Sequence, residues 1–246
     1  MTGRTTGILI GMSATSCKCL VIHSPLDLRV VEIDAGEVGC GQVAVRVAIG
    51  GICGSDLHYF HNGGFGTVRI KRPMILGHEV AGTVVSVGPD VTAVKIGDRV
   101  AVNPSRPCGT CSYCLEGLPN QCLEMRFYGS AMRDPHVEGA FRNLLVCDAV
   151  QCAALAAHVP FEIASLAEPF SVALHGVARA GSLLNKRVLV SGCGPIGTLA
   201  IAAAFAHGAM EIVAVDVTDE TLIIAREMGA TKTINVATRP DWTQQY

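Results

Sequence analysis

The chain has 246 residues, of which 50% are hydrophobic and 16% are charged, and its formal net charge is -2. This composition is typical of a globular protein with one or two domains, and the near-neutral charge gives no reason to expect binding to nucleic acid or an anionic membrane. No apolar run reaches the roughly 18 residues that a membrane-spanning helix needs, and the apolar patch at residues 7–11 is too short for a signal peptide. We therefore expect a cytoplasmic protein.

The first part of the chain has the pattern of short strands. Residues 1–11 are expected to be a disordered or overextended N-terminus. Residues 12–160 carry β-branched segments punctuated by glycine, which predicts an all-β, barrel-like domain. Strands are predicted at 43–47, 80–87 and 99–102, with turns between strands at 63–64, 88–90 and 97–98.

Residues 161–246 alternate between strand and helix patterns, which predicts a parallel sheet with right-handed crossovers. The predicted strands are 188–190, 212–215 and 233–236, and the predicted helices are 162–180 (interrupted at Pro169 and ended by Gly181), 195–207 and 219–228. This is one βαβαβ half of a doubly wound dinucleotide domain. The other half has no counterpart, so we expect the first strand to lie at an open sheet edge.

The chain has 11 cysteines, and an odd number in a chain of this length argues against a disulfide framework. Six have no partner at a metal-binding spacing and are expected to be small buried hydrophobic residues: Cys17, Cys19, Cys40, Cys147, Cys152 and Cys193.

Four other cysteines lie close together, namely Cys108, Cys111, Cys114 and Cys122. Four thiolates at this spacing can enclose Zn²⁺ in a tetrahedral shell with no open position, which indicates a structural site. An iron–sulfur cluster is the competing metal, but its ferredoxin motif has the fourth cysteine three residues after the third, followed by proline. Here the gap is seven residues and Leu123 follows. The alternative without metal is a loop of free thiols.

A second constellation is dispersed along the chain and consists of Cys53, the pair His78 and Glu79, and Glu168. A thiolate, an imidazole and a carboxylate can hold zinc and leave a position open, as catalytic sites do. Each residue alone is weak evidence, because single cysteines and histidines are more often structural.

Ser55 and His58 follow Cys53 and are candidates to carry a proton from a bound hydroxyl group to solvent. Alternatively, Ser55 caps a short helix that starts near Asp56, and His58 simply faces solvent.

A glycine-rich motif, G-x-G-x-x-G, stands between a predicted strand and a predicted helix. Its residues are expected to bind the pyrophosphate of a dinucleotide: Gly192, Gly194, Pro195, Ile196 and Gly197. Asp216 ends the next strand, where a carboxylate accepts hydrogen bonds from the adenosine ribose and repels a 2′-phosphate. The motif therefore favours NAD over NADP, although Asp216 could instead be a helix-capping residue.

Five segments occur in an order that resembles the zinc-containing medium-chain dehydrogenases: GGICGSDLH, LGHEVAG, the four-cysteine segment, AEP and GCGPIG. The resemblance extends from Met12 to the end. It implies a GroES-like β-barrel catalytic domain before a Rossmann domain, one catalytic and one structural zinc, and NAD(P)-linked alcohol oxidation. Glu168 resembles the polyol branch, which includes sorbitol and xylitol dehydrogenases. In that branch the ligands would be Cys53, His78 and either Glu79 or Glu168.

Further segments resemble the L-idonate 5-dehydrogenases, above all residues 58–59, 64–66, 103–105 and 125–132. That resemblance implies oxidation of L-idonate to 5-keto-D-gluconate. Arginine suits a substrate carboxylate, and Arg126, Arg133 and Arg142 are the candidates. A sorbitol, xylitol or threonine dehydrogenase, a zinc-independent reductase and an inactive zinc-binding fragment are the alternatives. A longer form is expected to be a homo-oligomer.

Overall fold

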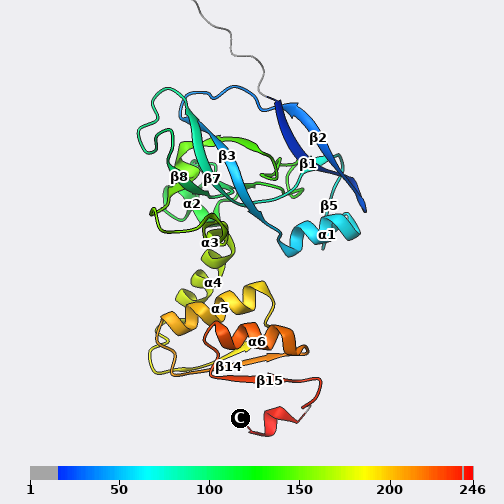
Figure 1. The fold of residues 1–246 in the computed structure, drawn as a ribbon, viewed down its shortest axis with the longest axis vertical. Coiled ribbons are helices and arrows are strands. Elements are labelled where there is room, and N and C mark those ends of the chain that lie inside the picture. The colour runs from blue at the N-terminus through cyan, green and yellow to red at the C-terminus, as the bar shows by residue number, and fades with distance from the viewer. Residues whose placement is uncertain (1–15, 240, 246) are drawn as a thin grey trace, which may run out of the picture. The chain divides into compact units, whose positions relative to one another are not determined.

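The computed structural model describes residues 16–239 and 241–245, so the expected N-terminal extension at residues 1–11 lies outside the described part. The chain forms two compact units, and the boundary falls between Ser165 and Leu166 (Figure 1). None of the described helices is both long and apolar enough to cross a membrane.

The main sheet of the first unit is antiparallel and has five strands in the order β11-β3-β7-β8-β12. Its strands are β3 (Gln42–Gly51), β7 (Glu79–Val87), β8 (Arg99–Val102), β11 (Leu144–Asp148) and β12 (Cys152–Ala154). The three predicted strands are confirmed as β3, β7 and β8. Alternating valines of these strands form the core, including Val43, Val45, Val84 and Val100, each with no exposed surface.

Smaller sheets complete the first unit. One has the order β2-β1-β6, and two are ribbons of two strands. Their strands are β1 (Ser16–Ser24), β2 (Asp27–Asp34), β4 (Gly64–Phe65), β5 (Val68–Arg69), β6 (Met74–Ile75), β9 (Ser105–Arg106) and β10 (Arg126–Phe127). The predicted all-β domain is present, but the described sheets do not close into the expected barrel. Closure needs every edge strand to be paired, and β11 and β12 each remain at an edge of the five-stranded sheet.

The helices of the first unit are short: α1 (Gly54–Asn62), α2 (Ser112–Leu115), η1 (Pro119–Gln121), η2 (Ala149–Gln151) and α3 (Phe161–Ser165). Helix α1 buries Asp56 and Tyr59, which lie one turn apart on the same face. It ends at Gly63, whose φ of 67° is left-handed. The predicted turn at residues 63–64 therefore follows a helix and does not join two strands.

The second unit confirms the predicted alternation. Its parallel sheet has the order β13-β14-β15, and α5 and α6 lie on the same side of it (Figure 1). The elements are α4 (Ala167–Ala180), β13 (Arg187–Ser191), α5 (Pro195–Ala206), β14 (Glu211–Asp216), α6 (Asp219–Glu227), β15 (Lys232–Asn235) and η3 (Trp242–Gln245). Ile201, Ile212 and Ala214 are fully buried in its core.

The break predicted within residues 162–180 lies at Leu166, between α3 and α4, and not at Pro169. Pro169 occupies the third position of α4 and is buried. Proline is tolerated there because the first four N–H groups of a helix have no partner within it.

The six cysteines expected in the core differ in burial. Cys17, Cys19, Cys147 and Cys193 are at most 2% exposed, as predicted. Cys152 is only partly buried. Cys40 is exposed and its thiol donates to Asp90 Oδ2 at 3.3 Å, so the prediction is wrong for this residue.

Candidate functional site

Three potential metal ligands from two separate segments meet in the first unit. Atoms of Cys53, His78 and Glu79 that can bind a metal all lie within 4.8 Å of one another. Cys53 is the N-cap of α1, and Glu79 is the first residue of β7. Gly77 allows this approach: its φ is +90°, and a Cβ there would meet the Phe141 ring at 2.2 Å.

Burial and hydrogen bonds set the charge of this cluster. His78 and Glu79 are 5% and 6% exposed. A hydrogen bond with His78, together with the Ser55 N–H and hydroxyl, lowers the pKa of the Cys53 thiol. These hydrogen bonds therefore favour the Cys53 thiolate, which is the form that binds a metal.

Asp56 is a member of the site that the sequence motifs did not single out. Its two carboxylate oxygens accept the N–H groups of Cys53 at 3.0 Å and Gly77 at 3.1 Å, so it joins the two ligand-bearing segments. It is 3% exposed, and desolvation raises its pKa. Its position at N3 after the helix cap was the available signal.

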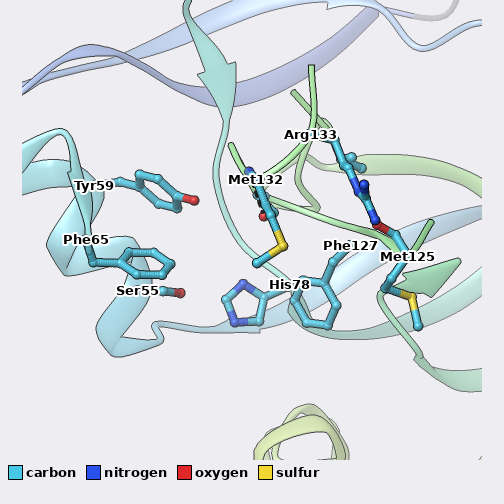
Figure 2. A pocket seen from close by; sticks show the side chains of 11 residues that line it. Ser55, Tyr59, Phe65, His78, Met125, Phe127, Met132 and Arg133 are labelled. Atoms are coloured by element: carbon cyan, nitrogen blue, oxygen red, sulfur yellow. Dashed lines mark hydrogen bonds between the residues drawn. The ribbon is translucent and has the colours of Figure 1, made fainter. Parts of the chain in front are cut away.

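A pocket of about 280 Å³ opens beside His78. Figure 2 shows His78 with Phe127 next to it, Ser55, Tyr59 and Phe65 to one side, and Met125 and Arg133 to the other. The His78 and Phe127 ring centroids are 5.2 Å apart. The wall is largely apolar, which leaves few polar groups to orient a ligand.

The predicted proton-relay residues lie on α1, three positions apart and thus on one face. Ser55 is partly buried and lines the pocket, whereas His58 is exposed, with its ring 6.1 Å from that of Phe65. The two side chains thus lead from the pocket, at Ser55, to solvent, at His58.

Glu168 belongs to the other compact unit, in the first turn of α4. The choice between Glu79 and Glu168 as the carboxylate ligand therefore stays a prediction.

The candidate arginines separate in the structure. Arg133 lines the pocket. Arg126 lines a neighbouring cavity of about 390 Å³, which Arg133 also borders. Arg142 donates from Nε to the carbonyl of Gly139 at 3.0 Å and does not line the pocket beside His78.

The four-cysteine lobe, residues 108–122, brings its four thiols together, with all sulfur atoms within 4.8 Å of one another. N–H groups point at them: Cys111 N–H donates to Cys108 at 3.3 Å, and Cys108 N–H donates to Cys122 at 3.2 Å. The N–H and hydroxyl of Thr110, followed by the Cys111 N–H, lower the pKa of Cys108 to about 6. Desolvation and the neighbouring thiols raise the pKa of Cys114 to about 12. Four such thiols ionise together only around a cation.

The glycine-rich loop joins β13 to α5 in the second unit. Gly192 has a φ of +88°, and a Cβ on Gly197 would lie 1.9 Å from the Gly192 carbonyl oxygen. Gly194 is the N-cap of α5 and has open space around its Cβ direction. The loop therefore leaves room beside unpaired helix N–H groups, which is what a pyrophosphate requires.

Asp216 accepts the Cys193 N–H at 2.6 Å with one oxygen and the N–H groups of Val217 and Thr218 with the other. These bonds, led by that from Cys193, lower its pKa. The carboxylate is thereby kept ionised at the end of β14.

Two family models match the chain: the alcohol dehydrogenase GroES-like domain over residues 39–157 and the zinc-binding dehydrogenase over residues 195–246. The chain belongs to the zinc-binding alcohol dehydrogenases. Both candidate metal clusters lie within the first matched region, and the helix that follows the glycine-rich loop, α5, lies entirely within the second.

Relatives in this family are close in sequence. L-Idonate 5-dehydrogenase (NAD(P)(+)) of Escherichia coli is 47% identical over 78% of this chain, and sorbitol dehydrogenase of Bacillus subtilis is 37% identical over 89%. The crystal structure of the E. coli L-idonate 5-dehydrogenase matches with a TM-score of 0.84 at 42% identity and covers 89% of this chain. The chain spans 55% and 61% of the lengths of these two relatives and 63% of the chain in the crystal structure.

Proposed function

We propose that this chain carries the catalytic centre of a zinc-dependent, NAD(P)-linked oxidoreductase that acts on a secondary alcohol of a polyol or sugar acid. The observation that carries the proposal is the Cys53–His78–Glu79 cluster, because its imidazole also lines the pocket. A thiolate, an imidazole and a carboxylate leave one tetrahedral position for a substrate oxygen.

The residues fit both proposed zinc ions. The buried cluster at Cys53 has three different donors, as an open catalytic site needs, and the lobe has four thiols, as a closed structural site needs. When bound at the open site, zinc acts as a Lewis acid that makes a coordinated alcohol more acidic.

The chain's own residues then handle the proton. The Ser55 hydroxyl lines the pocket and, in the proposed relay, accepts the substrate proton as it passes its own proton to His58. His58 lies one turn further along α1, at the surface, and takes the proton to solvent.

We propose that the glycine-rich loop holds the dinucleotide and that NAD is preferred over NADP. Gly194 leaves open space at the N-terminus of α5, and Asp216 is held as an anion where a 2′-phosphate would be repelled. Both forms occur in solved relatives: one was complexed with NADH and another was bound to NADP.

For the substrate we propose L-idonate, oxidised to 5-keto-D-gluconate. The support is the 47% identity to an L-idonate 5-dehydrogenase. Sorbitol is the second candidate, because sorbitol dehydrogenases are 37–39% identical over 86–89% of the chain.

We also propose a cytoplasmic location, since the described cysteines are thiols and a reducing compartment preserves them.

The test assays the purified protein with NAD and NADP against L-idonate, sorbitol, xylitol and threonine. We expect the highest kcat/KM with L-idonate and NAD. Cys53→Ser should lower turnover on the order of 10³-fold, because it disrupts the open metal site.

The matched control is Cys40→Ser, at an exposed thiol outside both clusters, which should leave turnover unchanged. NAD affinity, measured by fluorescence titration, should be the same in all three proteins. Full turnover by Cys53→Ser would contradict the proposal, as would a zinc-loaded, NAD-binding protein that oxidises none of the four substrates.

A further inference from the structure

The side chain of Arg133 ties down the segment that leaves the four-cysteine lobe. Its Nε donates to the Met125 carbonyl at 3.1 Å, and its Nη2 donates to the Leu123 carbonyl. Its Nη1 lies 3.2 Å from the Glu124 carboxylate. Three consecutive residues, the first of them adjacent to Cys122, are thus held by one guanidinium.

This exit segment, residues 122–127, runs from one candidate metal centre to the other. Cys122 supplies a thiol to the lobe. Met125 and Phe127 line the pocket, and the Phe127 ring packs against the His78 imidazole (Figure 2). A displacement of the segment at its lobe end would therefore move the pocket wall.

The backbone that carries Arg133 is itself firmly attached. The His136 Nδ1–H donates to the Arg133 carbonyl at 3.2 Å, and its Nε2 accepts the Lys71 N–H at 2.8 Å. His136 is 6% exposed. The ion pair between Arg72 and the neighbouring Asp134 is half exposed and contributes little to this attachment. Arg133 thus reaches across from a fixed support to the exit segment.

We propose that Arg133 is a positioning residue that latches the exit segment, so that metal retention in the four-cysteine lobe and the shape of the substrate pocket are coupled. The coupling to substrate rests on the proposed function, whereas the latch on the lobe does not. Coupling of this kind is reciprocal: the factor by which metal in the lobe changes substrate affinity equals the factor by which substrate changes metal affinity.

The contacts favour a latch over a clamp for a substrate carboxylate. Each of the three guanidinium nitrogens of Arg133 already has an oxygen partner from residues 123–125. A substrate carboxylate would have to displace one of them. The planar guanidinium of arginine can also hydrogen-bond several oxygens at once in a fixed geometry, whereas the ammonium group of lysine cannot.

The experiment compares Arg133→Met and Arg133→Lys with the parent protein and with Arg72→Met, all zinc-loaded. Arg72→Met removes a guanidinium bound to the same loop but leaves the latch intact. Alkylation of Cys108, Cys111, Cys114 and Cys122 is followed by mass spectrometry. We expect labelling roughly tenfold faster in both Arg133 variants, equivalent to about 1.4 kcal/mol, and unchanged in Arg72→Met.

A second readout uses L-idonate and L-iditol, its uncharged counterpart. The latch predicts that KM rises by the same factor for both substrates, with kcat little changed. A KM increase confined to L-idonate, or parental labelling rates in both Arg133 variants, would overturn the latch. Circular dichroism identifies any variant that has unfolded. If Arg133→Met has unfolded, the labelling rate and KM of Arg133→Lys decide between the outcomes. Faster labelling in a protein without turnover would support the latch and count only against the proposed function.

Discussion

Gly194 and Gly197 belong to one motif but have different surroundings. A Cβ at Gly197 would overlap the Gly192 carbonyl oxygen at 1.9 Å, so the residue is required for α5 to pack against the loop. Gly194 has a φ of -66° and nothing within 4 Å of its Cβ direction. Gly197 is therefore needed by the fold, and Gly194 by the proposed dinucleotide.

We predict that Gly197→Ala destabilises the protein by about 2 kcal/mol, because the loop must shift to relieve the overlap. Gly194→Ala should unfold like the parent protein but bind NAD at least tenfold more weakly, because its methyl group enters the space proposed for the pyrophosphate. Urea unfolding and NAD titration measure the two effects. Parental NAD affinity in Gly194→Ala would place the dinucleotide elsewhere.

At the scale of elements, η2 connects the edge strands of the main sheet and holds the β9–β10 ribbon nearby through one side chain. The Gln151 amide donates to the Asn103 carbonyl at 2.8 Å, and its oxygen accepts the Tyr128 hydroxyl at 2.9 Å. Tyr128 directly follows β10 and is 6% exposed. Burial raises the pKa of Tyr128 to about 12.

This pKa predicts an alkaline loss of stability. An unfolded tyrosine ionises near pH 10. Between pH 10 and about 12 the unfolded chain therefore releases a proton that the folded chain retains, and the free energy of unfolding falls as pH rises. Tyr128→Phe should cost about 1 kcal/mol at pH 7, because it loses a hydrogen bond. It should remove about 2 kcal/mol of the decline above pH 10. Urea unfolding against pH measures both, and identical slopes in the two proteins would refute the assignment.

At the scale of the whole molecule, the two units are expected to respond to different ligands. Both metal clusters are in the first unit, and the glycine-rich loop is in the second. We predict that chelation increases hydrogen exchange in residues 108–127 and leaves β13–β15 unchanged. NAD at 100 times its Kd should stabilise the loop region by about 2.7 kcal/mol. Chelation that increased exchange mainly in β13–β15 would contradict this division.

Local patterns were sufficient for much of this molecule. The spacing of four cysteines and the G-x-G-x-x-G motif are short-range features, because each places its chemistry within one loop. Strand β14 was also predictable, since a buried parallel strand is a continuous apolar run. Proline was less informative, because Pro169 is compatible with a first helical turn and did not mark the break.

The sequence alone determined the two-part organisation, the four-cysteine lobe and the glycine-rich loop, all of which depend on neighbours along the chain. Only the tertiary structure brought Cys53 beside His78 and Glu79, placed Asp56 between their segments, selected Arg133 from three arginines as the one at the pocket and left the sheets open. The physical reason is that these features depend on the pairing of distant strands and on the packing of segments between them, which no local spacing encodes.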